Sequence, residues 1–230
     1  MFETMKSIWK RPFLKAGVII ALFLSFTISN AQSVWTIGPR MGANYTWVSD
    51  VDNAEPKVKF TGGAFVMYSR WEHFGISADL LYAAKGMSYD YVIRDFPLKF
   101  KHDINFHYIE LPILATYFFN PREHSIRPKL YAGPSINYMV FGEHTGPYAR
   151  KATFQELDYA LIVGGGFNFR LAPTLWLNVD ARYSHGFINL NHYAWFNQDN
   201  IIRNRSVGLT VGLGFGIGGD GGTNDAPAAE

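Results

Sequence analysis

The adjacent residues Ser184 and His185 have side chains of the types that could support catalysis. A serine becomes a nucleophile when a histidine within hydrogen-bond distance accepts its proton and a third group orients that histidine. Both residues lie in a segment of alternating apolar and polar side chains, a pattern typical of a β-strand. Neighbouring strand residues point to opposite faces, so this pair cannot form a catalytic dyad.

Two further patterns do not indicate a site. Gly214, Gly216 and Gly219 match the spacing G-x-G-x-x-G, which marks a dinucleotide site only between a strand and a following helix. Here the glycines end a strand pattern and lead into a tail rich in Gly, Asp, Ala and Pro. The 7 histidines show neither H-E-x-x-H nor another clustered spacing that suits zinc. We therefore predict no catalytic residue, no metal ligand and no bound cofactor.

The beginning of the chain has the order of features found in a secretory signal peptide. Four basic residues, the last of them Lys15, precede the apolar stretch from Ala16 to Leu24, and Ser29 to Ala31 form a small-x-small end. This apolar stretch is shorter than the roughly 20 residues that a membrane-spanning helix needs. We predict that residues 1–31 are cleaved during export.

The chain after this segment is close to electrically neutral. It keeps 17 Lys and Arg against 18 Asp and Glu, a net charge of −1, so it lacks the basic footprint of a nucleic-acid-binding protein. Its length suits one domain. The sequence has no cysteine, so disulfides cannot stabilise the exported protein, and its many aromatic residues and glycines are typical of short strands with aromatic girdles.

Alternating apolar and polar residues recur in several segments, which we predict to be β-strands. In the last segment, every second residue from Val207 to Ile217 is large and apolar, and the residues between them are glycine or threonine. The eight predicted strands are residues 35–48, 58–69, 74–85, 106–119, 129–141, 159–171, 175–184 and 206–217.

The connectors between these segments are alternately long and short. In order they are residues 49–57, 70–73, 88–104, 120–125, 143–156, 172–174 and 187–203. Outer-membrane barrels have long loops at one end and short turns at the other. The pattern predicts an all-β fold, an eight-stranded antiparallel up-and-down transmembrane β-barrel at residues 32–218, with short periplasmic turns and long extracellular loops. The composition of residues 219–230 predicts a disordered periplasmic tail.

One face of the predicted strands carries charged residues of both signs. In a membrane barrel the apolar face meets lipid, closure pairs every backbone group, and the polar face lines the lumen. An eight-stranded barrel is only wide enough for side chains to fill it, so we expect a plugged lumen. The predicted lumen charge network comprises Arg40, Asp79, Lys85, Glu110, Lys129, Arg170, Asp180 and Arg182.

A soluble, lipocalin-like barrel is the alternative fold, with the polar face outside and an apolar interior that holds a small ligand. Gly208, Gly212 and Gly214 are too small to form a charged, soluble surface, whereas they suit a crowded lumen. The membrane barrel is therefore preferred. It predicts a location in the bacterial outer membrane, where the lipids contact the apolar face.

Several strings resemble the PorT-like outer-membrane β-barrel proteins. The resemblance implies an eight-stranded barrel in the outer membrane of Gram-negative bacteria. Some relatives are accessory factors for protein secretion and gliding motility through the type IX system, and the family has no established catalytic residues. The strings that carry the resemblance are Gly42 to Asn44, Leu80 to Gly86, Tyr108 to Leu114, Tyr131 to Pro134, Gly164 to Gly166 and Ala181 to Asn189.

Three functional hypotheses follow from these features. The first is a non-catalytic interaction or assembly module, such as a secretion accessory, whose protein partner binds the extracellular loops or the periplasmic end. The second is a lipid-modifying hydrolase or acyltransferase with Ser77, Ser135 or Ser184 as the nucleophile. The third is a narrow channel, which a charged, filled lumen disfavours.

The long loops are the surface on which the first hypothesis depends. Exposed aromatic residues mixed with polar groups suit protein contact, although the same aromatics also suit the outer girdle of a barrel. The candidate interaction residues are Tyr91, Arg94, Phe96, Tyr193, Trp195 and Phe196.

Overall fold

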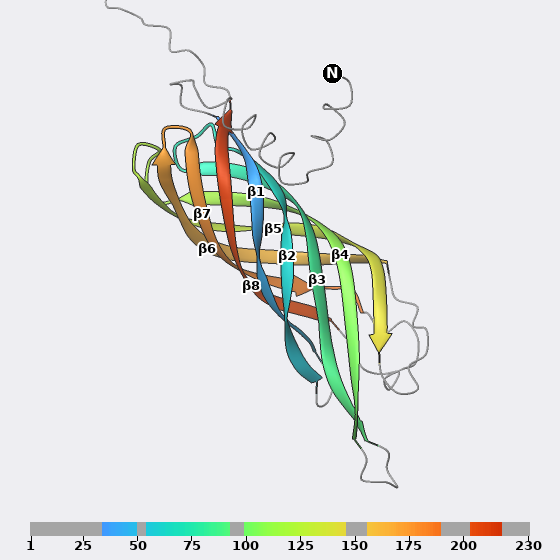
Figure 1. Ribbon diagram of the computed structural model, residues 1–230. Coiled ribbons are helices and arrows are strands. Elements are labelled where there is room, and N and C mark those ends of the chain that lie inside the picture. Colours follow the sequence, from blue (N-terminus) through green and yellow to red (C-terminus); the bar gives the residue numbers. More distant parts are fainter. Residues whose placement is uncertain (1–33, 50–53, 93–98, 146–155, 190–202, 218–230) are drawn as a thin grey trace, which may run out of the picture.

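The computed structural model describes residues 34–49, 54–92, 99–145, 156–189 and 203–217. Within these ranges the chain forms one elongated, twisted barrel of eight strands (Figure 1). The strands are β1 (Trp35–Val48), β2 (Ala54–Tyr68), β3 (Phe74–Val92), β4 (Lys99–Phe118), β5 (Ile126–Thr145), β6 (Leu157–Ala172), β7 (Leu175–Gly186) and β8 (Asn204–Ile217). No helix in the described ranges is long and apolar enough to cross a membrane. The predicted signal peptide and tail lie outside the described residues.

Antiparallel pairing between the first and last strands closes the barrel. Trp35 on β1 pairs with Tyr68 on β2 and with Ile217 on β8, and every other strand pairs with its neighbours in chain order. Closure leaves no strand edge with unpaired amides, which is the condition for a sheet surrounded by lipid. The predicted eight-stranded antiparallel barrel is confirmed.

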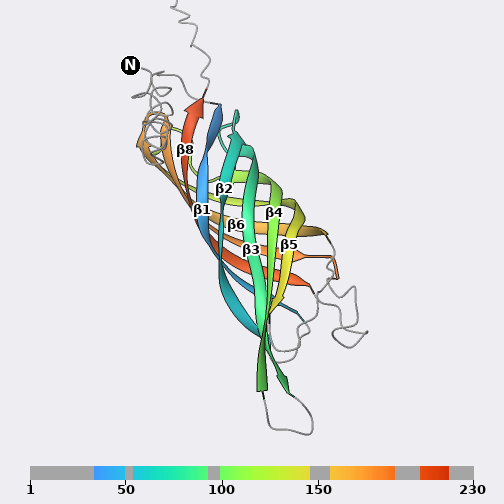
Figure 2. The ribbon, with the colours of Figure 1, turned by 45° about the vertical axis from the view of Figure 1, so that its right-hand side comes forward.

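The two ends of the barrel differ in shape. One end, here called the turn end, carries the short connections at residues 69–73, 119–125 and 173–174. At the other end, called the hairpin end, β3 and β4 run on together beyond most of the barrel (Figures 1 and 2). Asp90 still pairs with Lys101, and Val92 with Lys99.

The predicted loop at residues 88–104 is therefore wrong over most of its length, because β3 continues to Val92 and β4 starts at Lys99. Ser88 to Tyr91 alternate polar and aromatic residues, but Lys101 to Asp103 are all polar, so the two-residue period covers too few residues to predict the paired backbone. Two other strands are also longer than predicted, because β2 begins at Ala54 and β5 ends at Thr145.

The outer surface carries a band of apolar side chains. Leu80 on β3 and Leu209 on β8 are 58% and 65% exposed, whereas their inward neighbours Asp79 and Thr210 are buried. Aromatic residues gather at both margins of this band, as they do where a barrel meets two membrane interfaces. Those near the turn end are Trp35, Tyr68, Trp71, Phe74, Tyr117 and Phe119, and those near the hairpin end are Tyr45, Trp47, Tyr82, Phe141, Tyr183 and Phe187.

Gly86 occupies the place where β2 slips its register against β3, between Pro56 and Thr61. The Thr46 hydroxyl reaches across from β1, donates to the Gly86 carbonyl at 2.9 Å and accepts from the Gly86 amide at 3.3 Å. Gly86 has a φ of 154°, and a Cβ there would lie 2.2 Å from the Ile104 carbonyl oxygen. The position therefore requires glycine.

Gly86→Ala is expected to lower the free energy of unfolding by about 1–3 kcal/mol, because alanine would strain the backbone and clash with β4. Gly62→Ala is the matched control, since its nearest neighbour is the movable ring of Phe60. Urea unfolding of both variants in lipid vesicles measures the difference. Equal stabilities of the two variants would show that Gly86 is not strained.

Candidate functional site

An ion-pair network crosses the lumen at its middle. Arg40 on β1 extends between two carboxylates, with Nη1 2.7 Å from Asp79 Oδ2 on β3 and Nη2 3.1 Å from Asp180 Oδ2 on β7. These three side chains are at most 3% exposed. One guanidinium group thus connects opposite walls of the barrel.

Two more cations complete this network. Lys129 Nζ lies 2.8 Å from Asp180 Oδ1, and Arg182 Nη2 lies 3.2 Å from Asp79 Oδ2. Each carboxylate therefore contacts two cations. An unpaired charge inside a barrel would severely destabilise the fold. By sharing the two carboxylates, every charged group of the network has a partner of opposite charge.

Small residues on the opposite walls provide the space for these long side chains. A Cβ on Gly166 would lie 2.4 Å from Asp180 Oδ1, and one on Gly164 would lie 2.5 Å from the Tyr131 ring. On β8, Gly212 and Gly214 lie against the ring of Phe65, over which the Arg40 guanidinium is stacked at 4.7 Å. The glycine faces noted in the sequence are packing positions for the lumen side chains.

A separate ion pair, outside this network, lies between the network and the hairpin end. Lys85 Nζ is 2.6 Å from Glu110 Oε1 and stands over the Tyr108 ring. Asp158, which is 1% exposed, contributes a further buried carboxylate that the sequence analysis omitted. The strand prediction began at Tyr159, yet the alternation that places Ala160 and Ile162 inward also places Asp158 inward.

Arg170 does not belong to the lumen network, contrary to the prediction. Its guanidinium donates to the backbone carbonyl of Arg122 in a turn and stacks on the Trp176 ring at 4.8 Å. The alternation of β6 correctly predicts that Arg170 faces inward. However, Asp180 pairs with Gly166, and Arg170 lies four residues further along β6, too far to contact it. Arg170 is part of the turn end.

Apolar clusters occupy the lumen on both sides of the charged layers. Phe65, Met67 and Phe118 pack together toward the turn end. Toward the hairpin end, the cluster consists of Val48, Met87, Ile104, Phe106, Tyr108 and Met139. The interior of the described barrel is therefore filled along its length by side chains of both kinds.

The serines considered as nucleophiles are buried within the barrel, with Ser77, Ser135 and Ser184 each at most 9% exposed. Ser135 donates its hydroxyl proton to Asn137 Oδ1 at 2.6 Å. His185 Nδ1 hydrogen-bonds the Tyr183 hydroxyl at 3.2 Å and so lies on the face opposite to Ser184. In the described ranges no group of three or more His, Asp or Glu side chains could hold a metal ion.

The projecting hairpin of β3 and β4 is tied to β2 by polar contacts. Lys57 Nζ lies 2.7 Å from Asp103 Oδ1, which also accepts from the Ser88 hydroxyl at 2.6 Å. An exposed pair joins Lys101 to Glu55 at 2.7 Å. These bonds connect residues on three strands beyond the apolar band, so they hold the base of the hairpin in place.

The sequence profile of the outer membrane protein beta-barrel domain matches residues 30–191. The chain belongs to this outer-membrane β-barrel family. It resides in the outer membrane, and its apolar band faces lipid. No curated protein matches it in sequence.

Two solved structures are similar to this chain. OprG from Pseudomonas aeruginosa superposes with a TM-score of 0.53 at 15% identity, over 82% of this chain and 98% of OprG. The Neisserial surface protein NspA gives a TM-score of 0.48 at 16% identity, over 80% of this chain and 98% of NspA. At such identities the likeness concerns the fold alone.

Short turns of outer-membrane barrels face the periplasm, so the hairpin end of this family member faces outward from the cell. Asp103 stands there, beyond the apolar band, and the hydrogen bond from Lys57 holds the pKa of its carboxyl below the usual value. Of the candidate interaction residues, Tyr91 lies near the tip of the β3–β4 hairpin, where it pairs with Phe100. Arg94, Phe96, Tyr193, Trp195 and Phe196 lie outside the described residues.

Proposed function

We propose that this outer-membrane barrel is a non-catalytic interaction module whose docking surface is the β3–β4 hairpin. The observation that carries the proposal is the length of this hairpin, which stays paired to Val92 and Lys99 beyond the apolar band. A barrel needs its strands only across the membrane, so the extension is not required for insertion.

The polar contacts at the base of the hairpin support this role. Lys57, Ser88 and Asp103 join β2, β3 and β4, and Lys101 pairs with Glu55. A surface ordered before binding loses less conformational entropy when a partner docks. The hairpin therefore has the properties of a preorganised platform.

The contents of the lumen favour binding over transport or catalysis. The network centred on Arg40 fills the middle of the barrel, and apolar side chains fill both sides of it. The buried serines face this packed interior, away from His185. A substrate or an ion would have to displace paired charges.

The PorT-like strings support a more specific version of this proposal. In it, residues 1–31 are removed on export and the hairpin, or the periplasmic end, contacts a component of a secretion system of the type IX kind. The barrel then serves as an accessory to secretion and has no enzyme activity. Its partner is a protein, with outer-membrane lipids as its surroundings.

The experiment combines secretion and photo-crosslinking in the native bacterium. A gene deletion is expected to reduce secreted protein in the culture medium, and a copy lacking residues 90–101 should fail to restore it. A photoreactive amino acid at Asp90 should give a discrete protein adduct, whereas one at the lipid-facing Leu209 should give none. Normal secretion in the deletion strain together with no adduct at Asp90 would refute the proposal.

A further inference from the structure

Three arginines gather at the turn end, inside the mouth of the barrel. Arg127, at 4% exposure, donates from Nη2 to the Glu72 carbonyl at 2.7 Å and from Nε to the Asn120 carbonyl at 3.1 Å. Arg170 donates to the Arg122 carbonyl, and Arg122 donates to the Ser69 hydroxyl at 3.3 Å. Backbone carbonyls and a hydroxyl thus hold the three guanidinium groups, here called the arginine cluster.

The arginine cluster lacks a carboxylate partner within the described part of the chain. None of the ion pairs there includes Arg122, Arg127 or Arg170. The Nε groups of Arg122 and Arg170 are buried and have no hydrogen-bond partner among the described residues. Burial lowers the pKa of Arg122 below its ordinary value.

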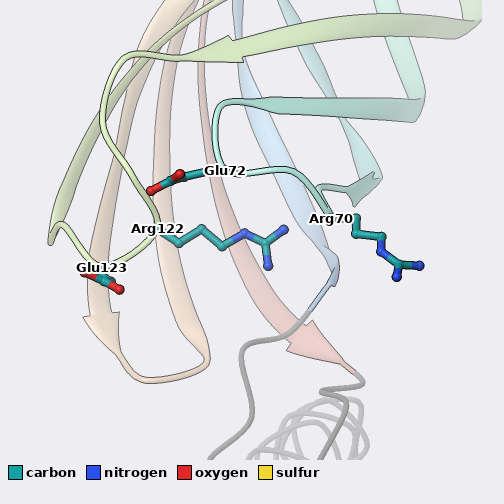
Figure 3. A pocket seen from close by; sticks show the side chains of 4 residues that line it. All are labelled: Arg70, Glu72, Arg122 and Glu123. Carbon is teal, nitrogen blue, oxygen red and sulfur yellow. The ribbon is translucent and has the colours of Figure 1, made fainter. Parts of the chain in front are cut away.

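An open pocket at the turn end includes one member of this cluster, Arg122, in its lining. Arg70, Glu72, Arg122 and Glu123 line it, and in Figure 3 Arg122 extends across the mouth while Arg70 points away from it. The carboxylates of Glu72 and Glu123 are on exposed residues and form no ion pair there. With the three arginines of the cluster against two glutamates, the mouth has an excess of positive charge.

Desolvated guanidinium groups with free donors are the usual partners of carboxylates and phosphates. We propose that the arginine cluster binds carboxylates, and that its occupant is the acidic segment 218–230 of this same chain. The cluster faces the lumen side of the mouth, since Arg127 is stacked over Phe118 inside the barrel at 3.9 Å. That location favours a peptide segment over the headgroup of a surrounding lipid.

The position and charge of segment 218–230 match this role. It follows Ile217, whose neighbour Gly216 bonds the Thr174 carbonyl at the turn end. It carries Asp220, Asp225 and Glu230 and no Lys or Arg. Thirteen extended residues reach at most about 45 Å, more than the mouth of an eight-stranded barrel requires. Binding would neutralise the positive charge at the periplasmic mouth.

Distances between two spin labels test this proposal on the full chain in lipid nanodiscs. Because the sequence has no cysteine, Ser125→Cys on the turn and Ala226→Cys in the segment give unique labelling sites. A narrow, short distance distribution is expected at low salt. It should broaden in 1 M NaCl, where the screening length is about 3 Å.

Two variants separate charge recognition from chance proximity. The tail variant D220N/D225N/E230Q should lose the short distance, and Arg122→Gln should reduce its population several-fold. Arg205→Gln, at the hairpin end, is the matched control and should leave the distribution unchanged. Circular dichroism verifies that each barrel is folded, and the tail variant keeps the test valid if Arg122→Gln fails to fold.

A broad distribution in the wild-type chain would overturn the proposal, as would a short distance that survives in the tail variant. Competition with inorganic phosphate is the remaining experiment. Displacement of the segment by millimolar phosphate would support an anion site that the segment occupies. Saturable phosphate binding that leaves an already broad distribution unchanged would assign the site to free anions and refute the role of the segment.

Discussion

Asp180→Asn is expected to lower the free energy of unfolding by about 3–5 kcal/mol, the range for breaking a buried ion pair from one side. Asp180 is 1% exposed and is the only ion-pair partner of Lys129 among the described residues. The substitution keeps the shape of the side chain but leaves Lys129 as an unpaired buried charge and Arg40 with one carboxylate instead of two. Denaturant unfolding in lipid vesicles measures the loss.

Two comparisons identify the cause of this loss. Adding Lys129→Met to Asp180→Asn should recover a substantial part of the stability, because it removes the unpaired charge. Glu55→Gln breaks the exposed pair with Lys101 and should change stability by less than about 1 kcal/mol. If Asp180→Asn cost no more than Glu55→Gln, the lumen network would not be the closely coupled group described above.

Leu209→Arg is expected to lower the free energy of unfolding by about 2–4 kcal/mol, the cost of a cation on the lipid face near the bilayer midplane. Leu209 is 65% exposed on the outer surface and pairs with Ala43 on β1 and Ala181 on β7, near the middle of those strands. Unfolding in lipid vesicles again gives the value.

The same substitution distinguishes a membrane barrel from a soluble one. In water, Leu209→Arg would replace an exposed apolar side chain with a solvated one at little expense of stability. Thr145→Arg, on an exposed residue at the hairpin end of β5, is the control and should be close to neutral in vesicles. Equal effects of the two arginines would mean that Leu209 does not face lipid.

The sequence was a good guide to the strands and to the faces of their residues. Alternation in β1, β7 and β8 depends only on which side a residue faces, so Arg40, Asp180 and Thr210 could be placed inward before the fold was known. Closure was predictable from the long and short connectors. The inward or outward face of a residue is a local property, so a two-residue period in the sequence is enough to predict it.

Partners across the lumen could not be predicted, because they depend on the stagger between strands. Arg170 and Arg182 both face inward, yet only Arg182 is level with Asp79. The arginine cluster was missed for a similar reason, since Arg122 is in a turn and Arg127 precedes the predicted start of its strand. The inward alternation from Lys129 back to Arg127 was the signal that could have found it.

The projecting hairpin of β3 and β4 also could not be predicted from the sequence pattern. Ser88 to Tyr91 alternate for only four residues, and Lys101 to Asp103 are three polar residues in a row. Their pairing depends on backbone hydrogen bonds and on ties such as Lys57 to Asp103, which join residues 46 positions apart. Composition therefore indicated a loop where the chain forms a hairpin.

Single-channel recording in a planar lipid bilayer is the most direct test of the central claim that this barrel is filled and acts through its ends. The network of Arg40, Asp79, Lys129, Asp180 and Arg182 predicts a baseline without steady conductance for the full-length protein at neutral pH. A stable open state of porin size in the wild-type protein would contradict a filled lumen and, with it, the assignment of function to the hairpin.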